Sequence, residues 1–202
     1  MRLKEPAGAV IDLTEPKSGV NTPVSVSGWG GDALLKGDDM PDLLVVLLVE
    51  DSEDDITVIR KAFERARIPN PLYVVKDGEA AIAYLAGKGK YAVRDEYPVP
   101  ALVLLDLKLP GMDGFEVLRW IRQTPGMSGL RVVVLTSSDS IRDVNAAYEL
   151  GANSFMVKEM DFQNTVELAR LLKDFWLVKA KVPESARVDE KAFREERNES
   201  RE

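Results

Sequence analysis

Acidic residues crowd the end of an apolar run near residue 50. In LLVVLLVEDSEDD, residues 43–55, seven apolar residues are followed by six residues of which five are acidic. Ser52 with an acid three residues later, Asp55, is typical of a helix N-cap, and acids in a first turn face the positive end of the helix dipole. Helix formation does not explain Glu50 and Asp51, which precede the cap. Adjacent carboxylates repel each other, so this pair indicates a nearby cation.

Other polar residues also stand at the ends of apolar runs. Asp106 follows LVLL, Thr136 ends RVVVLT and Lys158 follows SFMV. Each alone has an ordinary interpretation, since an Asp after a strand is often a turn residue, as expected for Asp113–Gly114. Together, acids, a hydroxyl and a lysine at four of five strand ends indicate one shared site.

Phosphoryl transfer to a carboxylate would use this set of side chains. A carboxylate nucleophile such as Asp106 can form an aspartyl phosphate. Mg²⁺ takes oxygen ligands and bridges to phosphate, so Glu50 and Asp51 would hold the ion that offsets the negative charge. Lys158 would neutralise one phosphoryl oxygen and Thr136 would hydrogen-bond another, because this chemistry depends on positioning and charge stabilisation.

The elements that must position these residues alternate along the chain. Apolar strands are predicted at 43–49, 72–75, 102–105, 131–136 and 154–157. Helices are predicted at 53–67, 78–86, 114–123, 140–150 and 161–177. Apolar strands alternating with helices predict a three-layer, doubly wound α/β domain with a five-stranded parallel sheet. Ligands bind such sheets at the carboxyl ends of the strands, where the strand order reverses.

Composition bounds the remaining possibilities. The 202 residues are 45% hydrophobic, and the net charge of −7 does not favour a nucleic-acid surface. Without Cys or His, the chain has no thiolate or imidazole chemistry. The N-terminus lacks the apolar region of a signal peptide, and no apolar run spans a bilayer, so a cytoplasmic protein without a membrane partner is expected. We expect a flexible arm at 1–40, a folded domain at 41–178 and a charged tail at 179–202.

Four motifs together resemble the receiver domain of two-component response regulators. They are VEDSEDD, LLDLKLPGMDGFEVL, VVVLTSSD and GANSFMVK, within residues 43–178. Three further stretches, ERARIPNPLYVVKDGEAAIAYL, GKGKYAVRDEYPVP and LLKDFWLVKAKVP, are similar to the small stand-alone regulators paired with bacterial phytochrome histidine kinases. The resemblance implies a flavodoxin-like fold with strand order 2-1-3-4-5.

The resemblance also assigns roles by position. Asp106 would be the phosphoacceptor, with Thr136 as the switch hydroxyl and Phe155 as the switch aromatic residue. Lys158 matches the lysine of the family motif. The expected Mg²⁺ ligands are the side chains of Glu50, Asp51 and Asp106 and the backbone carbonyl of Lys108.

The implied function is that of a single-domain response regulator. A sensor histidine kinase, such as a bacterial phytochrome, or a phosphotransfer protein would phosphorylate Asp106. The protein would not be an enzyme, since it would catalyse only its own phosphorylation and dephosphorylation. No DNA-binding output domain is expected, so the signal would pass through protein contacts. These include a homodimer through the fourth helix, the fifth strand, the fifth helix and the C-terminal extension DFWLVKAKVP, residues 174–183. An output role, a phosphate relay and a phosphate sink all remain open.

Three rival interpretations fit less well. Phosphatases of the haloacid dehalogenase type need a second Asp two residues after the nucleophile, where this chain has Lys108. A flavodoxin-like FMN protein would need a Ser/Thr-rich phosphate loop after the first strand, where this loop is acidic. A receiver that only binds partners would have lost its acids, and this chain has all of them.

Two positions depart from the receiver pattern. Lys108 lies two residues after the acceptor, where it could reach the site and alter hydrolysis. Glu159 stands where a proline usually follows the lysine, at a bond that is usually cis. A cis bond costs about 0.5–1 kcal/mol before proline but about 2.5–4 kcal/mol before other residues. We therefore expect a trans Lys158–Glu159 bond, with the lysine still reaching Asp106 on its long stem.

Overall fold

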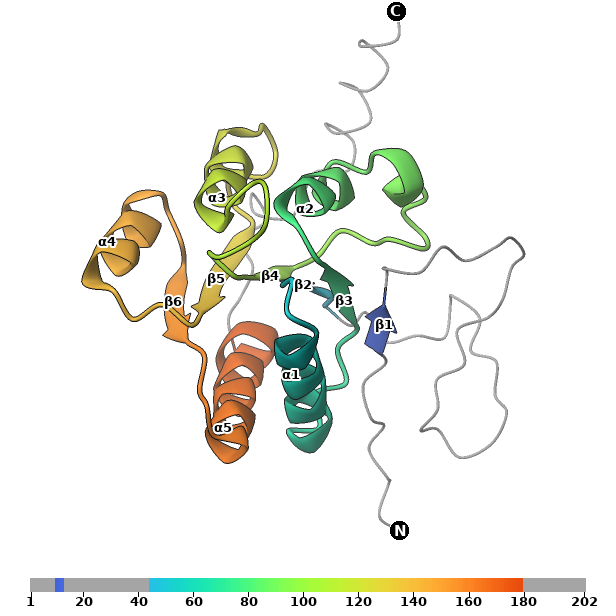
Figure 1. Ribbon diagram of the computed structural model, residues 1–202. Helices are drawn as coiled ribbons and strands as arrows, with labels where there is room; N and C mark the ends of the chain where they lie inside the picture. Colours follow the sequence, from blue (N-terminus) through green and yellow to red (C-terminus); the bar gives the residue numbers. More distant parts are fainter. Residues whose placement is uncertain (1–9, 13–43, 180–202) are drawn as a thin grey trace, which may run out of the picture.

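The computed structural model describes residues 10–12 and 44–179, which form a three-layer α/β arrangement (Figure 1). Helices α1 and α5 cover one face of a parallel sheet, and α2, α3 and α4 cover the other. The strands are β1 (Val10–Asp12), β2 (Val46–Val49), β3 (Leu72–Val75), β4 (Leu102–Leu105), β5 (Arg131–Thr136) and β6 (Ser154–Val157). The helices are α1 (Glu53–Arg65), α2 (Gly78–Leu85), α3 (Gly114–Gln123), α4 (Ile141–Glu149) and α5 (Phe162–Leu172), with a 3₁₀ turn at Gly89–Tyr91 and a π-helical segment at Lys173–Lys179.

The sheet order is β1-β3-β2-β4-β5-β6, and every pair is parallel. The five strands of the predicted domain therefore follow the order 2-1-3-4-5, which confirms the expected topology. One strand, β1, is additional to the five that were predicted, and its Val10 pairs with Leu72 of β3. It lies in the segment that was expected to be an arm without regular structure. The rest of the predicted arm, and the predicted tail beyond Lys179, lie outside the described residues.

The central strand β2 explains why its apolar run has no polar interruption. Leu47 and Val49 face the core beneath α2, α3 and α4, while Val46 and Leu48 face the core beneath α1 and α5. All four side chains are buried, because helices cover both faces of the strand. The burial fixes the end of β2, and with it the position of the acids that follow.

The C-terminal helix is shorter than expected. The predicted helix at 161–177 is α-helical only to Leu172, and the chain continues as the π-helical segment to Lys179. The buried Arg131, at the start of β5, donates a hydrogen bond from Nη1 to the Trp176 carbonyl oxygen at 2.7 Å. This bond ties the segment to the sheet. Among the described residues, no helix is long and apolar enough to cross a bilayer.

Candidate functional site

Three carboxylates meet at the carboxyl ends of two neighbouring strands. Glu50 and Asp51 follow β2, and Asp106 follows β4, which pairs with β2. One ligand oxygen from each of the three lies within 4.8 Å of the others. Glu50 is 1% exposed and Asp106 is 4% exposed, whereas Asp51 is open to solvent. The structure thus brings together the three acids that the sequence places at strand ends.

Burial makes this cluster costly without a cation. Desolvation raises the pKa of Glu50 to about 7, and the charge of Asp106 adds to the shift, while Lys158 opposes it. The oxygen donors are the hard ligands that Mg²⁺ and similar divalent ions prefer. The residues present therefore fit a divalent metal ion, which would favour the ionised form of Glu50.

Lys158 reaches into the cluster from the end of β6. Its Nζ lies 2.7 Å from Oδ2 of Asp106, 2.5 Å from Oε2 of Glu50 and 2.8 Å from Oδ2 of Asp55. Burial lowers the pKa of this ammonium, but hydrogen bonds to the three carboxylates outweigh that effect and raise the pKa above its ordinary value. The lysine therefore stays charged beside Asp106.

The peptide bond after Lys158 has the expected conformation. The Lys158–Glu159 bond is trans, which confirms the prediction made from the missing proline. The lysine still reaches Asp106, as expected from its long stem. The unexpected part is the contact with Asp55, whose backbone N–H also donates to Ser52 Oγ at 3.3 Å, as the N-cap pattern predicts. Asp55 lies 103 positions before Lys158 in the chain, so no local sequence pattern could have indicated the pairing.

Asp106 has both carboxylate oxygens engaged. Oδ2 accepts from Lys158, and Oδ1 accepts from the backbone N–H of Lys108 at 3.2 Å. The side chain of Lys108 is exposed. The backbone after β4 therefore curls around the carboxylate and fixes its orientation.

Helix α3 packs directly against the loop that follows β4. Gly114 donates its N–H to the Leu107 carbonyl oxygen at 3.1 Å, and a Cβ on Gly114 would collide with the Asp106 carbonyl oxygen. Asp113 is the N-cap of α3, in a reciprocal capping box with Glu116. The predicted helix at 114–123 is therefore confirmed, and Asp113, expected as a turn residue, is the cap from which that helix starts.

The hydroxyl of Thr136 lies at the end of β5 and is fully buried. Its Oγ1 accepts from the Ser138 N–H at 3.4 Å, and its carbonyl oxygen accepts from the Lys158 N–H at 2.8 Å. Ser138 in turn donates from Oγ to Oδ2 of Asp143, on α4, at 2.5 Å. Ser138 and Asp143 are not among the residues that the sequence predicts for the site, although both follow closely on Thr136.

Phe155 is half-buried on β6 and packs against the core cluster beneath α2, α3 and α4. It pairs in register with Val134 of β5, two residues before Thr136. Its expected role as a switch residue stays a prediction.

Comparisons with known proteins agree with this architecture. Residues 46–170 match the family model of the response regulator receiver domain. Response regulator Rcp1 of Synechocystis sp. is 38% identical over 139 residues, which span 69% of this chain and 92% of that protein. The phosphorylated cyanobacterial phytochrome response regulator RcpA is similar with a TM-score of 0.65 at 35% identity, over 70% of this chain and 99% of that one. The Mn(2+)-bound form of Rcp1 gives a TM-score of 0.63 at 38% identity, over 69% of this chain and 99% of that chain.

Proposed function

Because this chain belongs to the response regulator receiver domain family, we propose that it accepts a phosphoryl group on Asp106 from a sensor histidine kinase. One observation carries the proposal: the Lys158 ammonium lies 2.7 Å from the Asp106 carboxylate, in a cluster with two further acids. A buried aspartate with a purely structural role would not need a lysine and two further acids around it. Asp106 is thus held, oriented and partly neutralised, as a phosphoacceptor needs to be.

The metal ion is proposed to be Mg²⁺. Glu50, Asp51 and Asp106 would hold it, with the backbone carbonyl of Lys108 as a further ligand. The bound ion supplies positive charge to the phosphoryl oxygens. A structure of the relative Rcp1 is of its Mn(2+)-bound form, which supports a divalent ion as a ligand of this protein.

The transfer itself is a displacement at phosphorus. A carboxylate oxygen of Asp106 forms a bond to phosphorus as the bond from phosphorus to the kinase histidine nitrogen breaks, and the nitrogen keeps the electron pair. The Lys158 ammonium neutralises the negative charge on one phosphoryl oxygen, and the Thr136 hydroxyl donates a hydrogen bond to another. The residues contribute positioning and charge rather than covalent chemistry of their own.

The partners follow from the same family. The similarity to phytochrome response regulators supports a bacterial phytochrome as the kinase. We propose output through protein contacts, with Thr136 and Phe155 coupling the phosphoryl group to the surface of α4, β6 and α5. A homodimer through this surface and the C-terminal extension is part of the proposal.

Phosphorylation by a small donor tests the acceptor directly. Purified protein incubated with acetyl phosphate and Mg²⁺ should gain one phosphoryl group, seen by intact-mass spectrometry. Asp106→Asn should abolish the gain, and chelation of the metal should prevent it. Undiminished phosphorylation of Asp106→Asn would refute Asp106 as the acceptor.

A further inference from the structure

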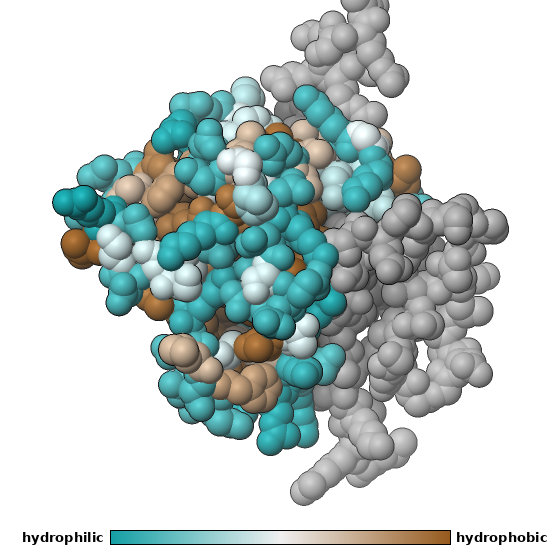
Figure 2. All heavy atoms as spheres, viewed as in Figure 1, coloured by the Kyte–Doolittle hydropathy of each residue, from teal (hydrophilic) through white to brown (hydrophobic). Residues whose placement is uncertain are grey.

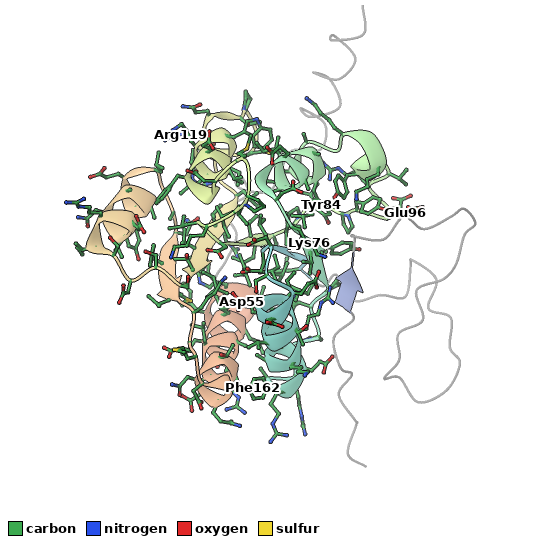
Figure 3. All side chains as sticks on the ribbon, viewed as in Figure 1. Asp55, Lys76, Tyr84, Glu96, Arg119 and Phe162 are labelled. Atoms are coloured by element: carbon green, nitrogen blue, oxygen red, sulfur yellow. The ribbon has the colours of Figure 1, made fainter. Side chains whose placement is uncertain are left out.

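Lys158 is surrounded by three carboxylates, of which one comes from an unexpected place. Glu50 and Asp106 belong to the acid cluster described above, but Asp55 lies in the first turn of α1 (Figure 3). The Asp55 carboxylate is 2.8 Å from the ammonium, and its side chain is 41% exposed, against 13% for Lys158. Asp55 is not one of the acids whose ligand atoms converge as a metal group.

The residues that follow Lys158 do not hold its side chain in place. Glu159, Met160 and Asp161 are all exposed, and the bond after the lysine is trans. A lysine carries its charge on a flexible four-carbon stem, so its direction depends on what the ammonium contacts. Position must therefore come from the partners at the tip of the side chain.

Space beside the lysine makes this restraint matter. A small cavity of about 30 Å³, partly open to solvent, lies between α1 and α5, and its lining includes Lys158, Asp55, Val58, Glu159 and Leu168. An ammonium released from its partners has room to swing away from Asp106 into this cavity. Asp55 stands at the boundary, because it both lines the cavity and binds the ammonium.

We propose that Asp55 is a positioning residue for phosphorylation, whose carboxylate keeps the Lys158 ammonium beside the acceptor. This rests on the proposed phosphorylation of Asp106. Glu50 and Asp106 have other tasks in that reaction, as metal ligand and as acceptor, whereas the Asp55 carboxylate binds the lysine and lies outside the group of acids that converge as metal ligands. Its N-cap contact uses the backbone N–H rather than the carboxylate, so the two roles are separable. Holding a reacting group in place before the reaction lowers its entropic cost.

The test compares two neighbouring acids of the same helical turn. Asp55→Asn keeps the size of the side chain and the cap but removes the charge that holds Lys158. Asp54→Asn removes the same charge from an exposed position on that turn and controls for the helix dipole. We expect phosphoryl uptake from acetyl phosphate to slow by about threefold to tenfold in Asp55→Asn, as for one lost positioning contact, and to be unchanged in Asp54→Asn. Asp55→Glu, which retains a carboxylate, should recover part of the rate.

A double-mutant cycle separates positioning from a general structural effect. In a Lys158→Ala background, Asp55→Asn should cause no further loss, because the group that it positions is gone. Equal losses in both backgrounds, or an unchanged or faster rate in Asp55→Asn, would overturn the proposal. Uptake by wild type that Asp106→Asn abolishes shows that the proposed function holds even where the Asp55 effect is absent. No uptake by wild type would overturn both.

Discussion

At the scale of single residues, the adjacent acids Glu50 and Asp51 have different environments. Glu50 is 1% exposed and its pKa is raised to about 7, whereas Asp51 is open to solvent and follows it directly in the chain. The buried acid lies against Lys158 at 2.5 Å. The exposed acid is the one through which a hydrated Mg²⁺ ion can enter, since this ion keeps several water ligands when it binds.

Mg²⁺ should therefore stabilise the folded protein, and Asp51→Asn should weaken that effect. A ligand that binds only the folded state adds about 2.7 kcal/mol at a concentration of 100 Kd. We expect Mg²⁺ to raise the melting temperature of wild type and of Asp54→Asn, and to raise it much less in Asp51→Asn at the same concentration. Thermal unfolding monitored by circular dichroism measures the shift. A Mg²⁺ response in Asp51→Asn equal to that of wild type would contradict Asp51 as a ligand.

The sequence predicts a site made of the acids, the hydroxyl and the lysine because each stands at the end of a strand. Parallel strands bring their carboxyl ends to one edge, so the topology places these residues together once the strands are recognised. The contact between Lys158 and Asp55 could not be found in this way. Its two residues are 103 positions apart, and helix capping already explains an acid at Asp55. A residue that has one sufficient local role gives no sign of a second.

At the scale of elements, the start of α3 packs against the loop that follows β4. Its first residue, Gly114, lies so close to Asp106 that a Cβ would collide with the backbone carbonyl oxygen of Asp106. The Asp113 capping box fixes where the helix begins. The helix and the loop are therefore coupled. The orientation of the Asp106 carboxylate depends on Gly114 having no Cβ.

Gly114→Ala should both destabilise the protein and slow phosphorylation. Forcing an extra methyl group into a packed site typically costs about 1–3 kcal/mol, and the loop must shift to admit it. Urea unfolding gives the loss of stability, and uptake from acetyl phosphate gives the rate. Gly126→Ala is the control, because Gly126 has a φ of 74° but open space around it. It should lose stability through backbone strain and phosphorylate normally. Equal rates for wild type and Gly114→Ala would contradict the coupling of helix and loop.

The elements also mark where sequence patterns stop being informative. Strands β2 to β6 and helices α1 to α4 are predicted nearly to their ends, because apolar runs mark the strands and the stretches between them are helical in pattern. The change from α-helix to π-helix after Leu172 depends on tertiary contacts such as Arg131 to Trp176. The edge strand β1 has three residues, too few for any periodic pattern.

At the scale of the whole molecule, a hydrogen-bonded chain leads from the site to an exposed apolar surface. Thr136 contacts Ser138, and Ser138 bonds to Asp143 in the first turn of α4. Helix α4 exposes Ile141 (69%) and Tyr148 (50%) seven residues apart, on one stripe of the helix. Figure 2 shows hydrophobic residues on the α4 side of a face that is otherwise largely hydrophilic. Movement of Thr136 toward a phosphoryl group would therefore act on α4 through Ser138.

Phosphorylation should consequently promote self-association through the α4 stripe. Beryllofluoride, a stable mimic of the phosphoryl group, should shift wild type from monomer toward dimer in sedimentation velocity at high concentration. Tyr148→Glu should abolish the shift, because it buries a charge at the centre of the contact. Val93→Glu is the control, since Val93 is 51% exposed and its segment, before β4, lies across the molecule from α4 (Figure 1). It should dimerise like wild type. A wild-type monomer both with and without the mimic, or equal loss in both variants, would count against a dimer that forms through α4 in response to the phosphoryl group.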